Sequence, residues 1–147
     1  LGASSYTFAE VTRSQKLCDW LSSHVSMYEF FGGVPELTIP DNLKSAVLKP
    51  CFVEPSLNES YRDLANHYGT SVMPAHVRKP RQKAKVEANV LVAQRWILAC
   101  LRHRKFSSIA EINEAIDPLL ERLNQRQMRT IKKSRCEWSC KLFRVRG

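Results

Sequence analysis

The spacing of apolar residues along this chain alternates between a period of about two and a period of about 3.6 residues. Residues 6–12 alternate bulky or β-branched side chains with smaller or polar ones, which is the pattern of a strand. Residues 14–31 then repeat apolar side chains at helical spacing until Gly32 and Gly33, where a helix ends easily. Strand patterns interleaved with helix patterns are typical of helices packed on a sheet, so the sequence predicts an α/β fold.

The same patterns predict further elements downstream. A Ser-x-x-Glu capping box opens two helices, at Ser56 and Ser108, because serine and glutamate side chains satisfy backbone N–H groups of the first turn. Residues 78–85 hold five basic residues and a proline, so this stretch is expected to begin as a loop that leads into a long helix. The expected elements are strands at residues 36–39 and 70–74 and helices at residues 56–68, 83–104 and 108–124. The helix at residues 83–104 is expected to bury an apolar stripe of Val86, Val90, Ala93, Ile97 and Leu101.

Length and composition indicate a soluble globular chain of one domain. The chain has 147 residues, of which 44% are hydrophobic and 25% charged, and no apolar run approaches the roughly 18 residues of a membrane span. Residues 1–8 lack the charged start and apolar stretch of a signal peptide. The five cysteines form no regular disulfide framework, so free thiols and a cytoplasmic location are expected. Cys136 and Cys140 lack a second Cys/His pair, so zinc is not expected.

The net charge of +9 resides in two blocks of the sequence. Residues 78–105 hold nine Lys or Arg against one acidic residue, and residues 121–147 hold nine against two. Such blocks occur where a protein contacts a phosphate backbone, because each neutralised phosphate releases condensed counterions. A basic block also occurs as a solvated face without any ligand, and charge alone favours neither interpretation.

Two acidic residues stand at positions where metal ligands occur. Asp41 follows the predicted strand 36–39, and Glu87 lies near the predicted start of the long helix, after the basic loop. Phosphoryl transfer by two metal ions needs carboxylates from different elements that hold the ions about 4 Å apart. Position alone favours structural roles, since an Asp before a turn bonds nearby amides and a Glu in a first turn complements the helix dipole.

The residues around these two carboxylates resemble a known family. The segments are LGASSYTFAEVT at residues 1–12, IPDNLKSAV at 39–47, EPSLN and YRDLANHYG at 54–69, and RKPRQKAKVE at 78–87. In this order they resemble the integrase core of IstA-type insertion-sequence transposases, over about residues 1–130. PDNLKS and KAKVE, with 45 residues between Asp41 and Glu87, are more specific than a lone Asp and Glu.

The resemblance implies a fold and an activity. Members are DDE transposases with a ribonuclease-H-like core, a mixed sheet with flanking helices, and they catalyse metal-dependent strand transfer during DNA integration. It implies two Mg²⁺ or Mn²⁺ ions in a complete active site, transposon-end and target DNA as partners, an IstB-type helper ATPase, and a homo-oligomer in the full-length protein. It also implies a partial catalytic core at residues 1–105, a helical extension at 106–130 and a basic irregular tail at 131–147.

The family pattern also assigns roles to individual residues. Asp41 corresponds to the second catalytic aspartate and Glu87 to the catalytic glutamate, and both would be metal ligands. Asn42 would shape the turn beside them. The basic residues of the RKPRQKAKVE segment would hold phosphates of the scissile strand rather than read its sequence, and they are Arg78, Lys79, Arg81, Lys83 and Lys85.

The sequence departs from the family in several places. The first catalytic aspartate belongs to a strand upstream of residues 1–5, and the first Asp in this chain is Asp19, within a predicted helix. We therefore expect a fragment that lacks the first strand and is inactive alone. Gln82 and Ala46 are mild departures, and the end from Cys136 resembles nothing in the family.

Two further interpretations remain open from the sequence. The chain could be a non-catalytic basic module that binds DNA or a partner through residues 78–105 and 121–147. It could also be a packing fragment whose basic blocks only contact solvent. Only the catalytic interpretation requires the carboxylates of Asp41 and Glu87 to converge within metal-bridging distance.

Overall fold

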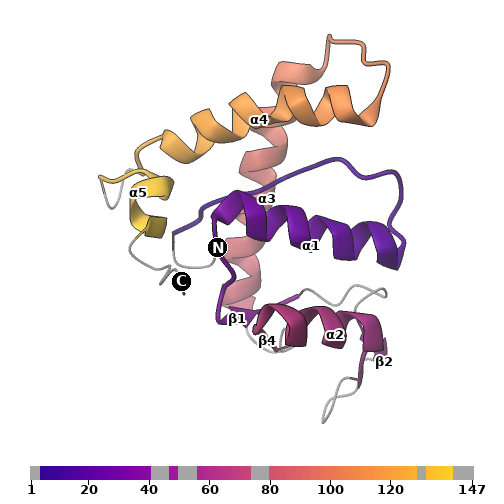
Figure 1. Ribbon diagram of the computed structural model, residues 1–147. Coiled ribbons are helices and arrows are strands. Elements are labelled where there is room, and N and C mark those ends of the chain that lie inside the picture. Colours follow the sequence, from indigo (N-terminus) through magenta and orange to yellow (C-terminus); the bar gives the residue numbers. More distant parts are fainter. Residues whose placement is uncertain (1–3, 41–46, 50–55, 74–79, 129–131, 141–147) are drawn as a thin grey trace. The chain divides into compact units, whose positions relative to one another are not determined.

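A computed structural model describes residues 4–40, 47–49, 56–73, 80–128 and 132–140, with the backbone alone at 47–49, 56–57, 80–86 and 140. The chain divides into two compact units. Figure 1 labels the helices and strands of both. The helical unit comprises residues 1–11 and 79–144, and the sheet unit comprises residues 12–78 and 145–147.

The sheet unit begins with helix α1, Leu17–Phe31, which confirms the predicted helix. The helix ends where Gly32 takes a left-handed backbone with φ of 65°, a conformation that favours glycine. Strand β1, Leu37–Thr38, then pairs in parallel with strand β4, Ser71–Val72, which confirms both predicted strands. Thr38 lies opposite Val72, and the Thr38 and Thr70 hydroxyls are hydrogen-bonded at 3.0 Å.

Helix α2, Glu59–Tyr68, connects these two strands after a short antiparallel pair, β2 (Val47–Lys49) with β3 (Ser56–Leu57). The capping box expected at Ser56 is wrong, because that residue belongs to β3. Asn58 caps the helix instead, and its side-chain oxygen accepts a hydrogen bond from the Ser60 N–H at 3.0 Å. The helix ends at Gly69, again in the left-handed region, as the sequence indicated.

The core of the sheet unit is built around Tyr61 of α2, whose side chain is fully buried. Its ring lies edge-on to Trp20 of α1, with ring centres 4.5 Å apart. The ring of His24, one turn further along α1, lies tilted or edge-on to both rings, with its centre 4.1 Å from that of Trp20 and 5.3 Å from that of Tyr61. Aromatic pairs at these separations add stabilisation beyond the apolar area that they bury. The cluster therefore fixes α1 against α2.

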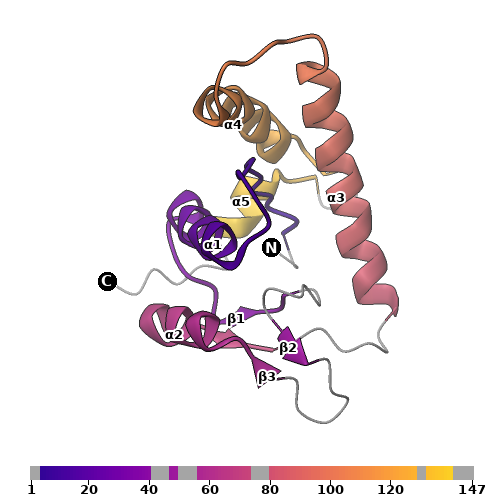
Figure 2. The same cartoon turned by 90° about the vertical axis from the view of Figure 1, so that its right-hand side faces the viewer.

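The helical unit contains helix α3, Pro80–Leu101, which is packed against helix α4, Ile109–Gln125 (Figure 2). The helix was expected to begin at Lys83, and that start is wrong by three residues, because residues 80–82 also belong to α3. Proline explains the difference, since its fixed φ suits the first helical position and its missing N–H has no partner there. The Trp96 indole N–H donates to the Leu119 carbonyl at 3.2 Å, which links the two helices.

Helix α4 supplies most of the buried surface of this unit. Its predicted capping box is confirmed at Ser108, whose hydroxyl accepts from the Glu111 N–H at 3.1 Å, while the Glu111 carboxylate accepts from the Ser107 N–H. The buried apolar residues of α4 are Ala115, Ile116, Leu119, Leu120 and Leu123. On α3, Ala93 and Ile97 are buried as expected, but Val90 is 48% exposed.

Residues 6–12, expected to form a strand, form none, so that expectation is wrong. The Asn124 side chain instead pairs with the backbone of Thr7, accepting from its N–H at 3.0 Å and donating to its carbonyl at 2.8 Å. Asn113 pairs in the same way with Val11, at 2.8 and 3.1 Å. Eleven residues are about three helical turns, so both amides lie on one face of α4 and take the place of a neighbouring strand.

The end of the described chain is more ordered than expected. Helix α5, Arg135–Cys140, lies in the stretch that was predicted to be irregular, and it contacts α4. A capping box starts it: the Ser134 hydroxyl accepts from the Glu137 N–H at 3.1 Å, and the Glu137 carboxylate accepts from the Ser134 N–H at 2.9 Å. The Ser-x-x-Glu spacing was present in the sequence, but the lack of an apolar period around it concealed the helix.

Replacing Asn124 with Ala should destabilise the helical unit by about 1–3 kcal/mol, because the Thr7 backbone groups lose their buried partners. Asn113→Ala is the matched control. It removes the same pair of hydrogen bonds at a solvent-exposed site, where water can replace them, so its cost should be smaller. Urea unfolding measures both free energies, and an equal cost at the two positions would contradict the role given to burial.

The sheet unit should lose stability as the pH falls below about 6.5, the ordinary pKa of histidine. Burial lowers the pKa of His24, although the bond from its Nδ1–H to the Trp20 carbonyl opposes this. The unfolded chain therefore takes up a proton that the folded chain binds only at lower pH, and acid favours unfolding. Urea unfolding midpoints between pH 7.5 and pH 5 should fall for the wild type and change less for His24→Phe. Exposed His67, changed to Gln, is the control, and an identical pH profile in the His24 variant would exclude this origin.

Candidate functional site

Of the two candidate acidic residues, only Glu87 lies within the described part of the chain. Asp41 and Asn42 lie outside the described residues, and the last described strand before them, β1, ends at Thr38. Glu87 lies on α3 and is exposed to solvent. The convergence of the Asp41 and Glu87 carboxylates stays a prediction.

Glu87 lies deeper in its helix than the sequence suggested. The helix begins at Pro80, so Glu87 occupies the third turn instead of the first. The field of the helix dipole acts mainly on charges within the first turn. A role in complementing the dipole therefore accounts poorly for Glu87, whereas a side chain exposed on a rigid helix can act as a metal ligand.

The candidate phosphate-binding residues flank the start of the same helix. Arg78 and Lys79 lie outside the described residues, and Arg81, Lys83 and Lys85 belong to the first two turns of α3. The backbone of α3 thus carries three basic residues before Glu87, and Arg81 lies in the helix although the sequence placed it in the loop.

Groups of three or more His, Cys, Asp or Glu side chains placed to hold a metal ion do not occur among the described residues. The metal site that the family resemblance implies includes Asp41, which is not one of them. Glu87 is exposed, and carboxylate oxygens are the hard donors that Mg²⁺ and Mn²⁺ take. The donor set therefore fits such ions chemically.

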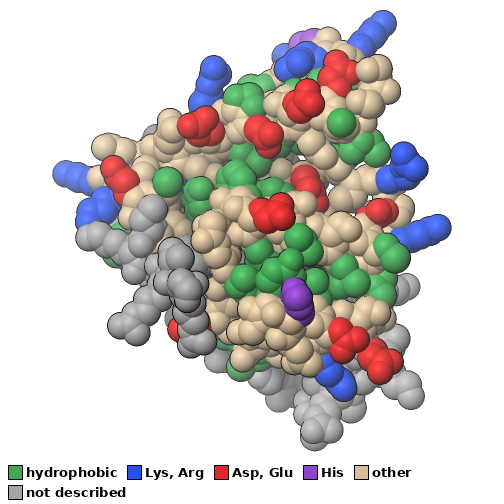
Figure 3. Space-filling model, viewed as in Figure 1, with side chains coloured by type: hydrophobic (Ala, Val, Ile, Leu, Met, Phe, Trp, Pro, Cys, Tyr) green, Lys and Arg blue, Asp and Glu red, His purple; other side chains and the backbone are tan. Residues whose placement is uncertain are grey.

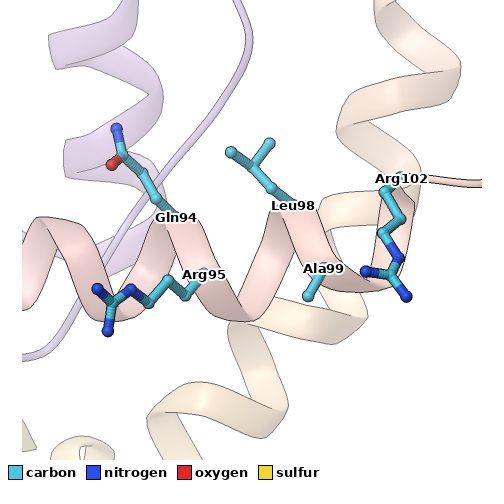
Figure 4. A pocket seen from close by; sticks show the side chains of 5 residues that line it. All are labelled: Gln94, Arg95, Leu98, Ala99 and Arg102. Atoms are coloured by element: carbon cyan, nitrogen blue, oxygen red, sulfur yellow. The ribbon is translucent and has the colours of Figure 1, made fainter.

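A shallow depression of about 500 Å³ lies along the second half of α3. One helix supplies all five side chains that line it, and they project from its surface without enclosing a cavity (Figure 4). They are Gln94, Arg95, Leu98, Ala99 and Arg102. Arg95 and Arg102 are seven residues apart, a spacing that places both on one helix face, and the sequence analysis did not single them out.

The same helix exposes apolar side chains that the predicted stripe did not anticipate. Leu91 is 50% exposed and Leu98 is 62% exposed. The helices in the described part of the chain are nevertheless too short or too polar to cross a lipid bilayer.

The arrangement of helices and strands is that of an integrase catalytic core. The structure matches the catalytic core domain of BIV integrase with a TM-score of 0.69, over 95% of this chain and 81% of that chain, at 14% sequence identity. It also matches a chain of the simian T-cell lymphotropic virus intasome solved with the PP2A regulatory subunit B56 gamma, with a TM-score of 0.64 over 87% of this chain and 41% of that chain, at 12% identity. These likenesses confirm the expected ribonuclease-H-like fold class.

Sequence relatives narrow this class. The chain is 49% identical over 138 residues to a protein named as the transposase of insertion sequence IS408, from Burkholderia multivorans, covering 94% of this chain and 27% of that protein. It is 43% identical to the protein named as the transposase of IS1162, from Pseudomonas fluorescens, covering 94% of this chain and 25% of that protein. The IS21 transposase of Pseudomonas aeruginosa is 28% identical, with 76% of this chain and 28% of that protein covered.

This chain belongs to the family of insertion-sequence transposases. It spans about a quarter of the length of the curated relatives that it matches. No family model matches it. The resemblance seen in the PDNLKS and KAKVE segments is thereby confirmed at the level of the family.

Proposed function

We propose that this chain is part of the catalytic core of a DNA transposase, which cuts and joins DNA strands at transposon ends with the help of divalent metal ions. The observation that carries the proposal is 49% identity over 138 residues to a protein named as a transposase, on a chain with an integrase-core fold. That aligned length is 94% of the chain.

Asp41 and Glu87 are the carboxylates proposed to act in the reaction. Both are hard oxygen donors, one in the segment that follows β1 and the other on the rigid helix α3. Bound Mg²⁺ or Mn²⁺ would supply positive charge that stabilises the attacking and leaving oxygens. The protein's own contribution is to hold the two carboxylates at a fixed separation, since small displacements of reacting groups reduce rates steeply.

DNA is the proposed partner, and the basic residues before Glu87 are its proposed contacts. Arg78, Lys79 and the three basic residues of α3's first turns would bind phosphates of the scissile strand and position it along the helix that carries Glu87. By family resemblance, an IstB-type helper ATPase and a homo-oligomer of the whole protein complete the proposed assembly.

Duplex DNA should bind this chain with an affinity that falls steeply with salt. Each neutralised phosphate contributes about 0.9 to the slope of log affinity against log salt. Changing Arg78, Lys79 and Arg81 to Ala should flatten this slope, which fluorescence anisotropy at several salt concentrations measures. The matched control changes three exposed basic residues outside both basic blocks to Ala, namely Arg13, Lys16 and Arg62. Equal slopes for the two triple variants would exclude a specific role for residues 78–81.

Strand joining tests the two carboxylates. In a chimera, this chain would replace the matching segment of the IS408-type relative, and joining of matched transposon-end DNA would be assayed with Mg²⁺. Asp41→Asn and Glu87→Gln should each abolish joining and leave DNA binding nearly unchanged, because each removes a metal ligand and leaves the phosphate-binding residues intact. Asp63→Asn, an exposed carboxylate on α2, is the control and should join normally. Joining by the Glu87→Gln chimera would remove Glu87 from the site and favour a non-catalytic DNA-binding role.

A further inference from the structure

The second basic block of the sequence lies outside the site described above. Residues 121–147 hold nine Lys or Arg against two acidic residues. The part of this block that the structure describes surrounds the point where α4 ends, the chain turns, and α5 begins. Figure 3 shows Lys and Arg side chains on this side of the helical unit. The α4–α5 corner is defined by Arg126, Lys132, Lys133, Arg135 and the two tryptophans beneath them, Trp96 and Trp138.

The backbone holds these cations in place. Gln127 and Ser134 form an antiparallel bridge, and inside it the Met128 N–H donates to the Lys133 carbonyl at 2.9 Å. The Lys132 N–H donates back to the Met128 carbonyl at 2.8 Å, and Lys132 takes a left-handed backbone with φ of 51°. A residue other than glycine keeps this conformation only where its surroundings determine it. Lys132 and Lys133 therefore lie on backbone that is hydrogen-bonded to Met128, which follows α4, in contrast to the irregular tail that the sequence predicted.

Two of the cations lie on aromatic rings. The Arg126 guanidinium is 5.7 Å from the centre of the Trp96 ring, and the Lys133 ammonium is 5.9 Å from the centre of the Trp138 ring. Trp96 is itself anchored, because its indole N–H donates to the Leu119 carbonyl. Cation–π contacts at these distances are attractive and restrict the position of the charged group. The rings thus act as platforms that present positive charge at the surface.

The corner also brings like charges together. Arg135 is partly buried, and its guanidinium donates to the Leu123 carbonyl at 2.9 Å, near the end of α4. Burial lowers the pKa of Arg135, and the nearby charge of Arg126 lowers it further. Capping the last carbonyls of α4 explains the position of Arg135. It does not explain why Arg126, a second cation, lies near it.

The acidic residues of the same block do not neutralise these charges. Glu137 accepts from the Ser134 N–H within the α5 cap, and Glu121 accepts from the Gln125 amide at 2.9 Å. Ion pairs to the four cations are not found in the described part of the chain. Clustered cations without carboxylate partners repel one another, and an anion that bridges them removes this repulsion.

We propose that the α4–α5 corner is a second phosphate-contacting surface, which binds the backbone of duplex DNA without reading its sequence. Guanidinium groups match phosphate oxygens with two parallel hydrogen bonds, and the lysines add point charges beside them. Four described cations, Arg126, Lys132, Lys133 and Arg135, come from a short stretch of chain, which suits a charged polymer better than a small anion. The inference rests on the proposed DNA binding and adds a surface that the carboxylate site does not include.

The test compares three triple variants of the whole chain on duplex DNA of arbitrary sequence. The first changes Arg126, Lys132 and Lys133 to Gln and keeps Arg135, because Arg135 caps α4. The second changes Arg78, Lys79 and Arg81, and the third is the control at Arg13, Lys16 and Arg62, also to Gln. The corner variant should lower the salt slope by about 0.9 for each phosphate that it no longer neutralises, beyond the change in the control. Circular dichroism verifies that each variant is folded.

A local probe gives a second, independent measurement. The chain has three tryptophans, of which Trp96 and Trp138 lie at the corner and Trp20 lies in the core of the sheet unit. Titration of duplex DNA into ¹⁵N-labelled chain should shift the indole N–H signals of Trp96 and Trp138 and leave that of Trp20 in place.

The outcomes separate the inference from the proposed function. Absence of any DNA binding by the unsubstituted chain would contradict the proposed function and with it this inference. Binding that depends on residues 78–81, while the corner variant keeps the wild-type slope and the Trp96 and Trp138 signals do not move, overturns the inference alone.

Discussion

The helical unit depends on the pairing of one buried side-chain amide with one backbone peptide. Asn124 is 3% exposed, and it joins α4 to Thr7 across 117 positions of sequence. A buried backbone N–H or carbonyl without a partner costs about as much as a lost hydrogen bond, so an extended segment must find partners somewhere. Asn124 and Asn113 supply them from a helix, and the segment from Thr7 to Val11 therefore follows α4.

The sheet unit is stabilised by a different interaction. Its parallel pair of strands is only two residues long in each strand, too short to be stable by its own hydrogen bonds. The packing of Tyr61 against Trp20 and His24 holds α1 and α2 together, and these helices lead the chain into β1 and β4. The segment that contains Asp41 thus follows a strand whose position depends on an aromatic core.

Two structural elements, α3 and the α4–α5 corner, hold the charged residues that the proposals use. Helix α3 begins at proline, so its basic first turns and Glu87 lie along one continuous axis. At the α4–α5 corner, a hydrogen-bonded turn and two tryptophans fix another set of cations. A fixed charge binds a phosphate with less loss of conformational entropy than a charge on a flexible tail.

The sequence by itself determined the helices α1 and α4, the strands β1 and β4 and the glycine that ends α1. Its motif spacing also indicated the family. Both were possible because periodicity, capping and motifs are local signals. It also placed Glu87 on the long helix, although the start of that helix was set too late. Only the tertiary structure decided that residues 6–12 form no strand and that Arg126 lies over the ring of Trp96. Those outcomes depend on single side chains that meet residues far away in sequence, and such pairings leave no periodic trace in the sequence.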